Sequence, residues 1–402
     1  MGKPILISGG GLSSLLLARS LLRSSIPFQI FERDSSISFR AQGYRLRLSS
    51  EGLDAIEAVL TPEAFGRFWE TCGKTGGGGF GELNSTTGEK MAADTSASSL
   101  ATGKAEQTIK ETLRSRDGKV VGIARGEMRR LFLEGCEPHI KWSHTVTGYE
   151  LTESGVRAIF ADGTKSVEGD MLVGGEGIHS RVAKQLSRGK LKIFDTGARG
   201  IHGQAPTTAF KQLGEGVWRI VDDTKPDGRV FVITNVRAGD MDDPDISFGW
   251  TMGAQPGVIN VPGDNDALIG EQAANLARDL TRHWHPSLKP LFDQMHVSEA
   301  AFWKITCSTP SGVPEWKNEP RVTVIGDAVH SMTPAGGIGA NTAVRDSALL
   351  GRLLRDAGGF RHGLTDQYER EMRVYASEAV AMSYGLATAQ FGIEIDEDSA
   401  TL

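Results

Sequence analysis

The sequence predicts an α/β fold in three parts: a Rossmann-like domain built on a parallel sheet, an inserted α+β domain whose sheet is mostly antiparallel, and C-terminal helices. Two observations predict the Rossmann-like domain: a short apolar run enters a glycine loop and a helix near residue 9, and a similar arrangement recurs near residue 325. A third observation predicts the insertion, because residues 188–263 alternate β-type runs with turns.

The first glycine loop is Gly9-x-Gly11, which follows an apolar run at residues 4–8 and opens an apolar helix to about Leu22. In a dinucleotide-binding unit the first glycine makes the tight turn, and the second lets the backbone approach a pyrophosphate. A third glycine usually allows close packing of helix and strand, and Ser14 takes that place here. The loop therefore predicts a dinucleotide site, with a plain strand–turn–helix unit as the alternative.

An acidic residue at the expected distance supports the dinucleotide interpretation. The next β-type run, residues 28–31, ends in Glu32, which lies 21 residues after Gly11. A carboxylate in this place binds a ribose hydroxyl in dinucleotide-binding folds. A surface position for Glu32 is the alternative.

The second glycine loop suits the other end of the same ligand. A strand at residues 322–325 runs into Gly326-Asp327, and the small-residue loop 334–339 then leads to a helix that opens near Asn341. Free backbone N–H groups and the positive end of a helix dipole favour developing negative charge. Asp327 is predicted to bind ligand hydroxyls, with a simple helix cap as the alternative.

The remaining elements follow from periodicity and turn residues. Residues 72–118 are rich in Gly, Ser and Thr, and they predict two short strands and a surface loop, with Gly76–Gly79 as a turn rather than a phosphate loop. Strands are expected at 43–48, 144–151, 155–160, 165–174 and 297–306. Helices are expected at 50–59, 62–71, 265–282 and 363–390; a further helix starts at about 123, and another ends at about 186.

Composition excludes several classes of protein. The 402 residues carry a net charge of -6, so nothing indicates a nucleic-acid surface. Three scattered cysteines predict neither a disulfide framework nor a metal site, and they favour a reducing compartment. No secretory signal and no membrane-length apolar run is visible. We therefore expect a cytoplasmic protein, monomeric or homodimeric, without membrane or nucleic-acid partners.

Four motifs in their order along the chain resemble the single-component FAD-dependent aromatic hydroxylases, the p-hydroxybenzoate hydroxylase-like family. The resemblance covers residues 4–355 and is strongest in the motifs. The second motif, residues 172–181, has Glu176 where the family has Asp. The third motif is nearly complete and includes His330, to which we assign no proton-transfer role.

The resemblance implies roles for particular residues. Gly9, Gly11, Glu32 and Arg33 resemble the adenosine end of an FAD site, and Asp327 the residue that holds a ribityl hydroxyl. Arg45 resembles an arginine beside the pyrophosphate, and Arg125 one that contacts the phosphates or the ribityl chain; either could instead be a surface residue. The implied cofactor-binding set is Gly9, Gly11, Leu12, Ser13, Glu32, Arg33, Arg45, Arg125, Asp327, Pro334, Gly337, Gly339, Ala340 and Asn341.

The resemblance also implies a division into domains. The FAD-binding domain would comprise residues 1–72, 101–187 and 297–362, and the substrate domain residues 73–100 and 188–296. Residues 363–402 would form a C-terminal helical segment with an acidic tail. Substrate contacts expected by residue type are Arg199, His202, Trp218, Phe248, Trp250 and Met252, of which about half are expected to be plain core.

The implied function is an FAD-dependent monooxygenase that transfers one oxygen atom from O2, through a C4a-hydroperoxyflavin, to an electron-rich aromatic or natural-product-like molecule. One dinucleotide fingerprint implies bound FAD and a transiently docked NADPH or NADH. Alternatives within the fold are a reductase or dehydrogenase, and a scaffold or cyclase with structural FAD. A flavin-dependent halogenase is excluded, because no two of the seven tryptophans form its Trp-x-Trp signature.

Overall fold

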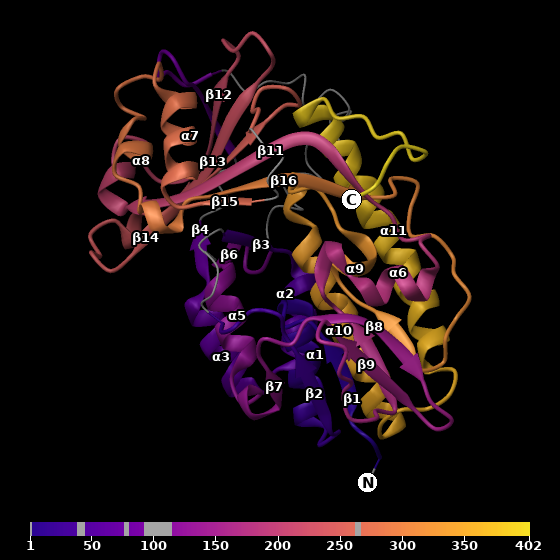
Figure 1. The fold of residues 1–402 in the computed structure, drawn as a ribbon. Helices are drawn as coiled ribbons and strands as arrows, with labels where there is room; N and C mark the ends of the chain where they lie inside the picture. Colours follow the sequence, from indigo (N-terminus) through magenta and orange to yellow (C-terminus); the bar gives the residue numbers. More distant parts are fainter. Residues whose placement is uncertain (1, 38–44, 76–79, 92–114, 262–266) are drawn as a thin grey trace.

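The computed structural model describes residues 2–37, 45–75, 80–91, 115–261 and 267–402, which form two lobes (Figure 1). The predicted glycine turn at 76–79 and most of the predicted surface loop lie outside these residues. The lower lobe in Figure 1 contains a parallel sheet, the upper lobe contains a larger sheet, and the predicted α/β class is confirmed.

The lower lobe is built on a five-stranded sheet whose strands all run parallel. Its strands read as continuous apolar runs because both faces are covered, as β1 illustrates with four buried residues. In spatial order the strands are β17 (Val322–Val324), β10 (Met171–Gly174), β1 (Ile5–Ser8), β2 (Phe28–Phe31) and β7 (Ile140–Lys141).

Helices and a hairpin surround this sheet. Helix α1 packs against α10, α5 and α2, and α11 contacts α10, β16 and β17 along one side of the molecule (Figure 1). The bounds of the helices are α1 (Leu12–Arg23), α2 (Ser50–Val59), α3 (Pro62–Thr71), α5 (Arg125–Leu133), α6 (Arg181–Ser187), α7 (Glu271–Thr281), α8 (Pro290–Asp293), α9 (Asp327–His330), α10 (Gly339–Ala357) and α11 (Leu364–Phe391).

The upper lobe is built on a seven-stranded sheet that is antiparallel except where β5 pairs with β12. Helices α7 and α8 cover one face and share an apolar core with it. In spatial order the strands are β15 (Ala267–Ile269), β16 (Ala301–Ser308), β11 (Ile193–Pro206), β14 (Ser247–Ala254), β13 (Val230–Val236), β12 (Gly216–Asp222) and β5 (Phe80–Asn84).

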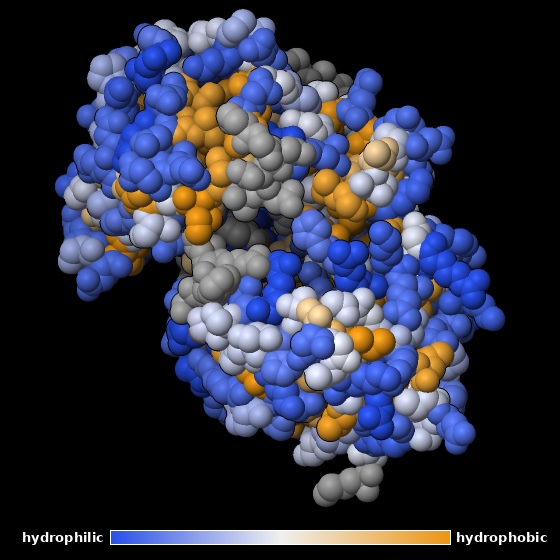
Figure 2. All heavy atoms as spheres, in the orientation of Figure 1, coloured by the Kyte–Doolittle hydropathy of each residue, from blue (hydrophilic) through white to orange (hydrophobic). Residues whose placement is uncertain are grey.

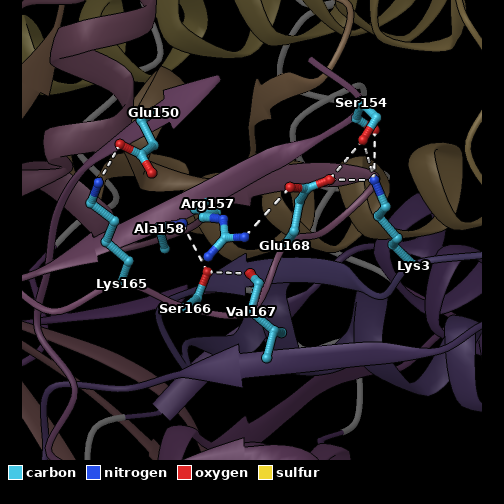
Figure 3. A network of polar contacts seen from close by, with 9 residues as sticks. All are labelled: Lys3, Glu150, Ser154, Arg157, Ala158, Lys165, Ser166, Val167 and Glu168. Carbon is cyan, nitrogen blue, oxygen red and sulfur yellow. Dashed lines mark hydrogen bonds and ion pairs between the residues drawn. The ribbon is translucent and has the colours of Figure 1, made fainter. Parts of the chain in front are cut away.

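Two small β units complete the fold. A three-stranded sheet of β3 (Arg45–Leu48), β6 (Val120–Ala124) and β4 (Gly73–Thr75) lies at the top of the lower lobe, next to the upper lobe (Figure 1). The hairpin of β8 (Val146–Leu151) and β9 (Val156–Phe160) contacts the parallel sheet. A polar network fastens Lys3 to this hairpin through Ser154 and Glu168 (Figure 3).

Three predicted elements differ from the structure. Only residues 171–174 of the predicted strand 165–174 form a named strand, because Lys165 and Gly169 make single bridges. The predicted helix at 265–282 begins at Glu271, and β15 precedes it. Strand β16 is hydrogen-bonded in the seven-stranded sheet, although its residues were predicted to belong to the FAD-binding domain. The domain boundaries stay a prediction.

Candidate functional site

The loops that follow four parallel strands converge at one edge of the five-stranded sheet. Strand β1 leads into Gly9, β2 into Glu32, β10 into Gly175 and β17 into Gly326. Because the strands are parallel and neighbouring, their carboxyl ends meet, and such an edge is where open α/β sheets bind ligands. Segments more than 300 residues apart in the sequence therefore form one site.

Gly9 has a conformation and surroundings that demand glycine. Its φ is +92°, and a Cβ there would lie 2.5 Å from the carbonyl oxygen of Gly175. Its N–H donates to the carbonyl of Phe31 at 2.7 Å, which fixes the turn on β2. The first and second motifs thus pack directly against each other at Gly9 and Gly175.

The amino ends of α1 and α10 are distinctive among the helices that the structure describes. Every other described α-helix has a side-chain N-cap, an acidic residue in its first turn, or both, whereas α1 and α10 have neither. Their first backbone N–H groups lack the partners that capping residues supply elsewhere. Both amino ends can therefore bind the negative charge of a ligand.

Glu32 lies beside the first glycine loop. Its carboxylate accepts hydrogen bonds from the N–H of Gly10 at 2.5 Å and from the N–H of Asp34 at 2.9 Å. Arg129 of α5 donates from Nε to the carbonyl of Gly10 at 2.9 Å, and its Nη2 lies 3.6 Å from Glu32 Oε2. Glu32 and Arg129 are both buried, so they form a fixed wall beside the first glycine loop.

Asp327 begins α9, just after the carboxyl end of β17. The side chain is exposed, yet the surrounding protein raises the pKa of its carboxyl by removing bulk water. The positive groups of His330 and Arg125 oppose that rise. An exposed carboxylate in a poorly hydrated recess is suited to accept hydrogen bonds from the hydroxyls of a ligand.

A buried network supports the Asp327 turn from below. Asp346 of α10 accepts hydrogen bonds from the N–H of Gly326, from His330 Nε2 and from the hydroxyl of Tyr375, each at 2.7 Å. Burial works to lower the pKa of His330, but the charge of Asp346 and its hydrogen bond outweigh burial, and the pKa is raised. The network joins α9, α10 and α11 and fixes the carboxyl end of β17.

Asn341 holds the second glycine loop in place. Its Nδ2 donates to the carbonyls of Arg47 at 3.0 Å and Gly337 at 2.8 Å, and its Oδ1 accepts from the N–H of Ser49 at 2.8 Å. Arg47 also donates from Nη1 to the carbonyl of Gly336 at 3.0 Å. The side chain of Asn341 therefore joins α10 to β3, and only its backbone remains for a ligand.

The other predicted cofactor residues occupy different places around this edge. Ser13 Oγ is within 3.2 Å of the Ala343 carbonyl and Ser347 Oγ of α10. Arg33 and Pro334 are exposed. Leu12 begins α1, and Gly339 and Ala340 form the amino end of α10.

The two predicted arginines lie apart from each other. Arg125 begins α5, and its charge acts on both Asp327 and His202, so it lies between the two lobes. Arg45 donates from Nη2 to the carbonyl of Gly122 at 2.8 Å, and its other neighbours are in β4 and at the end of β13. These neighbours place Arg45 with the three-stranded sheet rather than with the Gly9 loop.

Glu176 serves the helix that follows it. Its carboxylate accepts from Ser180 Oγ at 2.8 Å and from the N–H of Val182 at 3.3 Å, so it stabilises the amino end of α6. Burial raises the pKa of this carboxyl, and the bond from Ser180 opposes the rise. The longer side chain thus reaches α6, while the backbone before it packs on Gly9.

Four predicted substrate residues lie on the covered face of the seven-stranded sheet. Trp218, Phe248, Trp250 and Met252 belong to the core shared with α7 and α8. Trp250, for example, donates from Nε1 to the Leu291 carbonyl at 2.9 Å. Arg199 forms a bidentate salt bridge with Asp195, with N–O distances of 2.7 and 3.1 Å.

The opposite face of that sheet is directed toward the second glycine loop. Phe231 and Ile305 form a separate apolar cluster with Ala335 of the loop and with Phe391 of α11. Ile233 and Trp303 pack against this cluster. Figure 2 shows the surface hollowed between the two lobes, in the orientation of Figure 1. Side chains alternate between faces along a strand, so the residues next to the predicted aromatic ones face this region.

His202 is the predicted substrate residue that lies on the loop-facing side. Its ring is 5.5 Å from that of Trp303. Burial, with a contribution from the charge of Arg125, lowers its pKa to about 4. The imidazole is therefore neutral at pH 7.

Two features are absent from the part of the chain that the structure describes. No described helix is both long enough and apolar enough to cross a membrane. No group of three or more His, Cys, Asp or Glu side chains among the described residues could hold a metal ion.

Residues 3–383 match the model of a protein family described as "FAD binding domain". The chain belongs to this FAD-binding family. The predicted resemblance to p-hydroxybenzoate hydroxylase-like proteins and the predicted FAD cofactor are thereby confirmed. The Gly9 turn, the Glu32–Arg129 wall, the exposed Asp327 and the uncapped ends of α1 and α10 fit the two phosphates, the ribose and the ribityl chain of FAD.

Individual relatives agree with this assignment. The chain is 29% identical over 451 residues to the "Dual O-methyltransferase/FAD-dependent monooxygenase elcB" of Phaeosphaeria nodorum, covering 97% of this chain and 46% of that protein. It thus spans about half the length of that relative. It is 27% identical over 367 residues to the "FAD-dependent monooxygenase thnD" of Trichoderma harzianum, covering 87% of this chain and 82% of the relative.

The fold also occurs in a solved flavoprotein. Klebsiella pneumoniae HpxO, complexed with FAD and uric acid, superimposes with a TM-score of 0.72 over 97% of this chain and 89% of its own, at 18% identity. At that identity the likeness concerns the fold alone.

The sequence predictions missed Arg129, Asp346 and Arg47. Arg129 lies one helical turn after Arg125, between the buried residues Met128 and Leu131, so helical periodicity could have marked it as a buried charge. Asp346 likewise lies among the buried residues of α10, so helical periodicity could have marked it as a buried charge too. Arg47 shares a strand face with Arg45, but its partner in the glycine loop is distant in sequence.

Proposed function

We propose that the chain is an FAD-dependent monooxygenase that inserts one oxygen atom from O2 into an electron-rich aromatic or natural-product-like molecule, with NADPH or NADH as reductant. The observation that carries the proposal is the junction of two regions. The second glycine loop, which leads into the uncapped amino end of α10, packs through Ala335 against the face of the seven-stranded sheet that α7 and α8 do not cover. Helices α7 and α8 cover the other face, and α11 packs against Phe231 on this side, so the surface beside Trp303 would remain for a small organic molecule.

The chain's own groups would bind and orient the cofactor. Glu32 would accept a hydrogen bond from a ribose hydroxyl, and Asp327 would accept one from the ribityl chain. FAD, when bound, supplies the redox chemistry by accepting a hydride and activating dioxygen. The amino end of α10 would stabilise negative charge on the ring through N–H groups that need no reorganisation.

The face of the upper lobe would hold the substrate and exclude water. Ile233 and Trp303, which are only partly buried, would provide an apolar surface near the glycine loop. His202 is neutral and lies beside Trp303, so it would offer a hydrogen bond rather than a charge. Exclusion of water protects reactive oxygen species from unproductive decay.

The relatives support oxygen insertion over the alternatives. Both relatives named above are called FAD-dependent monooxygenases, and one is a dual-function protein of which this chain matches about half. A single dinucleotide fingerprint in this chain supports transient docking of the nicotinamide nucleotide. We propose a monomer or homodimer.

The test separates reduction from oxygen transfer. The FAD-loaded protein is first mixed with NADPH or NADH without oxygen, in the presence of candidate phenols and aromatic polyketides, and flavin bleaching is followed. Oxygen is then admitted, and products are analysed by mass spectrometry for a gain of one oxygen atom from ¹⁸O2. Bleaching without oxygen transfer to any candidate would favour the reductase, and no bleaching with either nucleotide would favour structural FAD.

A further inference from the structure

Two arginines from different lobes meet beside Gly73. Arg45 lies on β3 of the lower lobe, and Arg237 directly follows β13 of the upper lobe. Atoms of both side chains lie within 3.1 Å of the place that a Cβ on Gly73 would occupy. The absence of a side chain at Gly73 therefore lets two guanidinium groups approach each other.

The two positive charges are incompletely balanced. Arg237 pairs through Nε with Asp240, which is 31% exposed, while Arg45 donates to the carbonyl of Gly122 at 2.8 Å. Burial and then the charge of Arg237 lower the pKa of Arg45 to about 10. One carboxylate thus faces two guanidinium groups in a poorly hydrated place, where like charges repel strongly.

One hydrogen-bond donor of this arginine pair has no acceptor among the described residues. The side chain of Arg237 is only 9% exposed, and its Nη1 is buried without a hydrogen-bond partner among the described residues. A buried guanidinium nitrogen without an acceptor is costly, so an anion that supplies an acceptor would be bound favourably here. Asp240 and the Phe248 ring, 4.9 Å from the guanidinium carbon, hold Arg237 in a fixed orientation.

The location is the junction between the lobes. Thr75 of β4 donates to Asn235 of β13 at 2.8 Å, two residues from Gly73 and from Arg237 respectively. Strands β3, β4 and β6 lie next to the upper lobe (Figure 1). The contacts of the pair are distinct from those of Gly9, Glu32 and Asp327.

We propose that Arg45 and Arg237 form an oxyanion site, separate from the FAD-binding groups, that binds a phosphate or carboxylate group of a small molecule held between the two lobes. Guanidinium groups bind both kinds of oxyanion with paired N–H donors. The phosphates of a nicotinamide nucleotide and the carboxylate of an acidic organic substrate share this chemistry. The site assigns Arg45 to a second ligand instead of the FAD pyrophosphate.

The structure supplies a matched control on the same strand. Arg229 directly precedes β13, as Arg237 directly follows it, and each pairs with an aspartate through Nε. Arg229 is 36% exposed, so its charge is hydrated. Arg229→Gln removes the same charge from the other end of the strand without touching the proposed site.

The first experiment measures anion binding. Inorganic pyrophosphate and benzoate are titrated calorimetrically into the FAD-loaded wild type and into Arg45→Gln, Arg237→Gln and Arg229→Gln. We expect at least one probe to bind the wild type and the control equally, and to bind each site variant at least tenfold more weakly, with unchanged FAD content. Absence of binding to the wild type, or equal weakening by Arg229→Gln, would overturn the proposal.

Two further arms identify the source of the anion and guard against misfolding. A tenfold rise in the Kd for NADPH during anaerobic flavin reduction assigns the site to the nucleotide, and a rise confined to benzoates that perturb the flavin spectrum assigns it to the substrate. Gly73→Ala, which places a methyl group between the two guanidinium groups, is expected to weaken the same probe. Loss of FAD from Arg45→Gln that excess FAD does not reverse would place Arg45 in the FAD site and refute the proposal.

Discussion

The two sheets of this molecule carry their functional groups in different ways. In the parallel sheet the groups lie in loops after the strands, so Gly9, Glu32 and Asp327 meet at one edge. In the seven-stranded sheet the candidate groups lie along the strands and on one face only, opposite the helix-covered core. An edge site can be recognised from short motifs, whereas a face site requires knowledge of which face is covered.

The largest effect on FAD binding and stability is expected at Gly9, where the backbone packs most closely at the edge of the parallel sheet. Gly9→Ala should abolish detectable FAD binding and destabilise the fold, because a Cβ would lie 2.5 Å from the Gly175 carbonyl oxygen at a φ of +92°. FAD fluorescence quenching and thermal unfolding measure the two effects. In Gly11→Ala the Cβ would be 3.8 Å from the same oxygen, so that variant should keep its FAD-free stability and lose only FAD affinity. Normal FAD affinity in Gly9→Ala would contradict this account of the turn.

Substitutions of two neighbouring residues on β14 test the difference between the two faces of the seven-stranded sheet. Trp250→Ala should lower the free energy of unfolding by about 4 kcal/mol, because it leaves a cavity in the core under α7 and α8. Thr251→Ala alters a half-buried residue of the other face and should change the free energy by less than about 1 kcal/mol. Chemical denaturation gives both values. Similar losses in the two variants would show that the two faces do not differ as described.

Two aspartates near the end of β17 should separate stability from binding. Asp346→Asn should cost about 3 kcal/mol of unfolding free energy, because two buried donors and the partly buried Tyr375 hydroxyl depend on that carboxylate. Asp327→Asn should leave the stability of FAD-free protein unchanged and weaken FAD binding at least tenfold, since the side chain is exposed to the ligand space. Unfolding of FAD-free protein and FAD titration are the two measurements. Full FAD affinity in Asp327→Asn would move the ribityl partner elsewhere.

The smallest effect concerns acid stability. The pKa of His202 is lowered from 6.5 to about 4, so the unfolded chain binds its proton first as the pH falls. The neutral imidazole therefore costs stability that is absent above pH 6.5 and grows as the pH falls toward 4, reaching about 2 kcal/mol at pH 5. His202→Gln should lose less stability between pH 7 and pH 5 than the wild type does. Equal slopes in both proteins would mean that His202 titrates normally in the fold.

The sequence predicted the parallel sheet and its loops because each motif is local. The predicted helices at 50–59 and 62–71 coincide with α2 and α3, whose caps Ser49 and Thr61 are adjacent in sequence. Arg129, Asp346 and the pairing of Arg45 with Arg237 depend on contacts between distant segments. The aromatic residues of β12 and β14 looked suitable for a substrate, but residue type cannot tell a covered face from an open one.

The central claim is that both ends of the chain form one FAD site. It is tested most directly by titrating FAD into FAD-free wild type, Glu32→Ala and Asp327→Ala, with protein stability measured in parallel. We predict one FAD per wild-type chain and at least tenfold weaker binding in each variant, at unchanged stability for Asp327→Ala. Wild-type protein that binds no FAD, or a variant at either end that binds it with wild-type affinity, would contradict the claim.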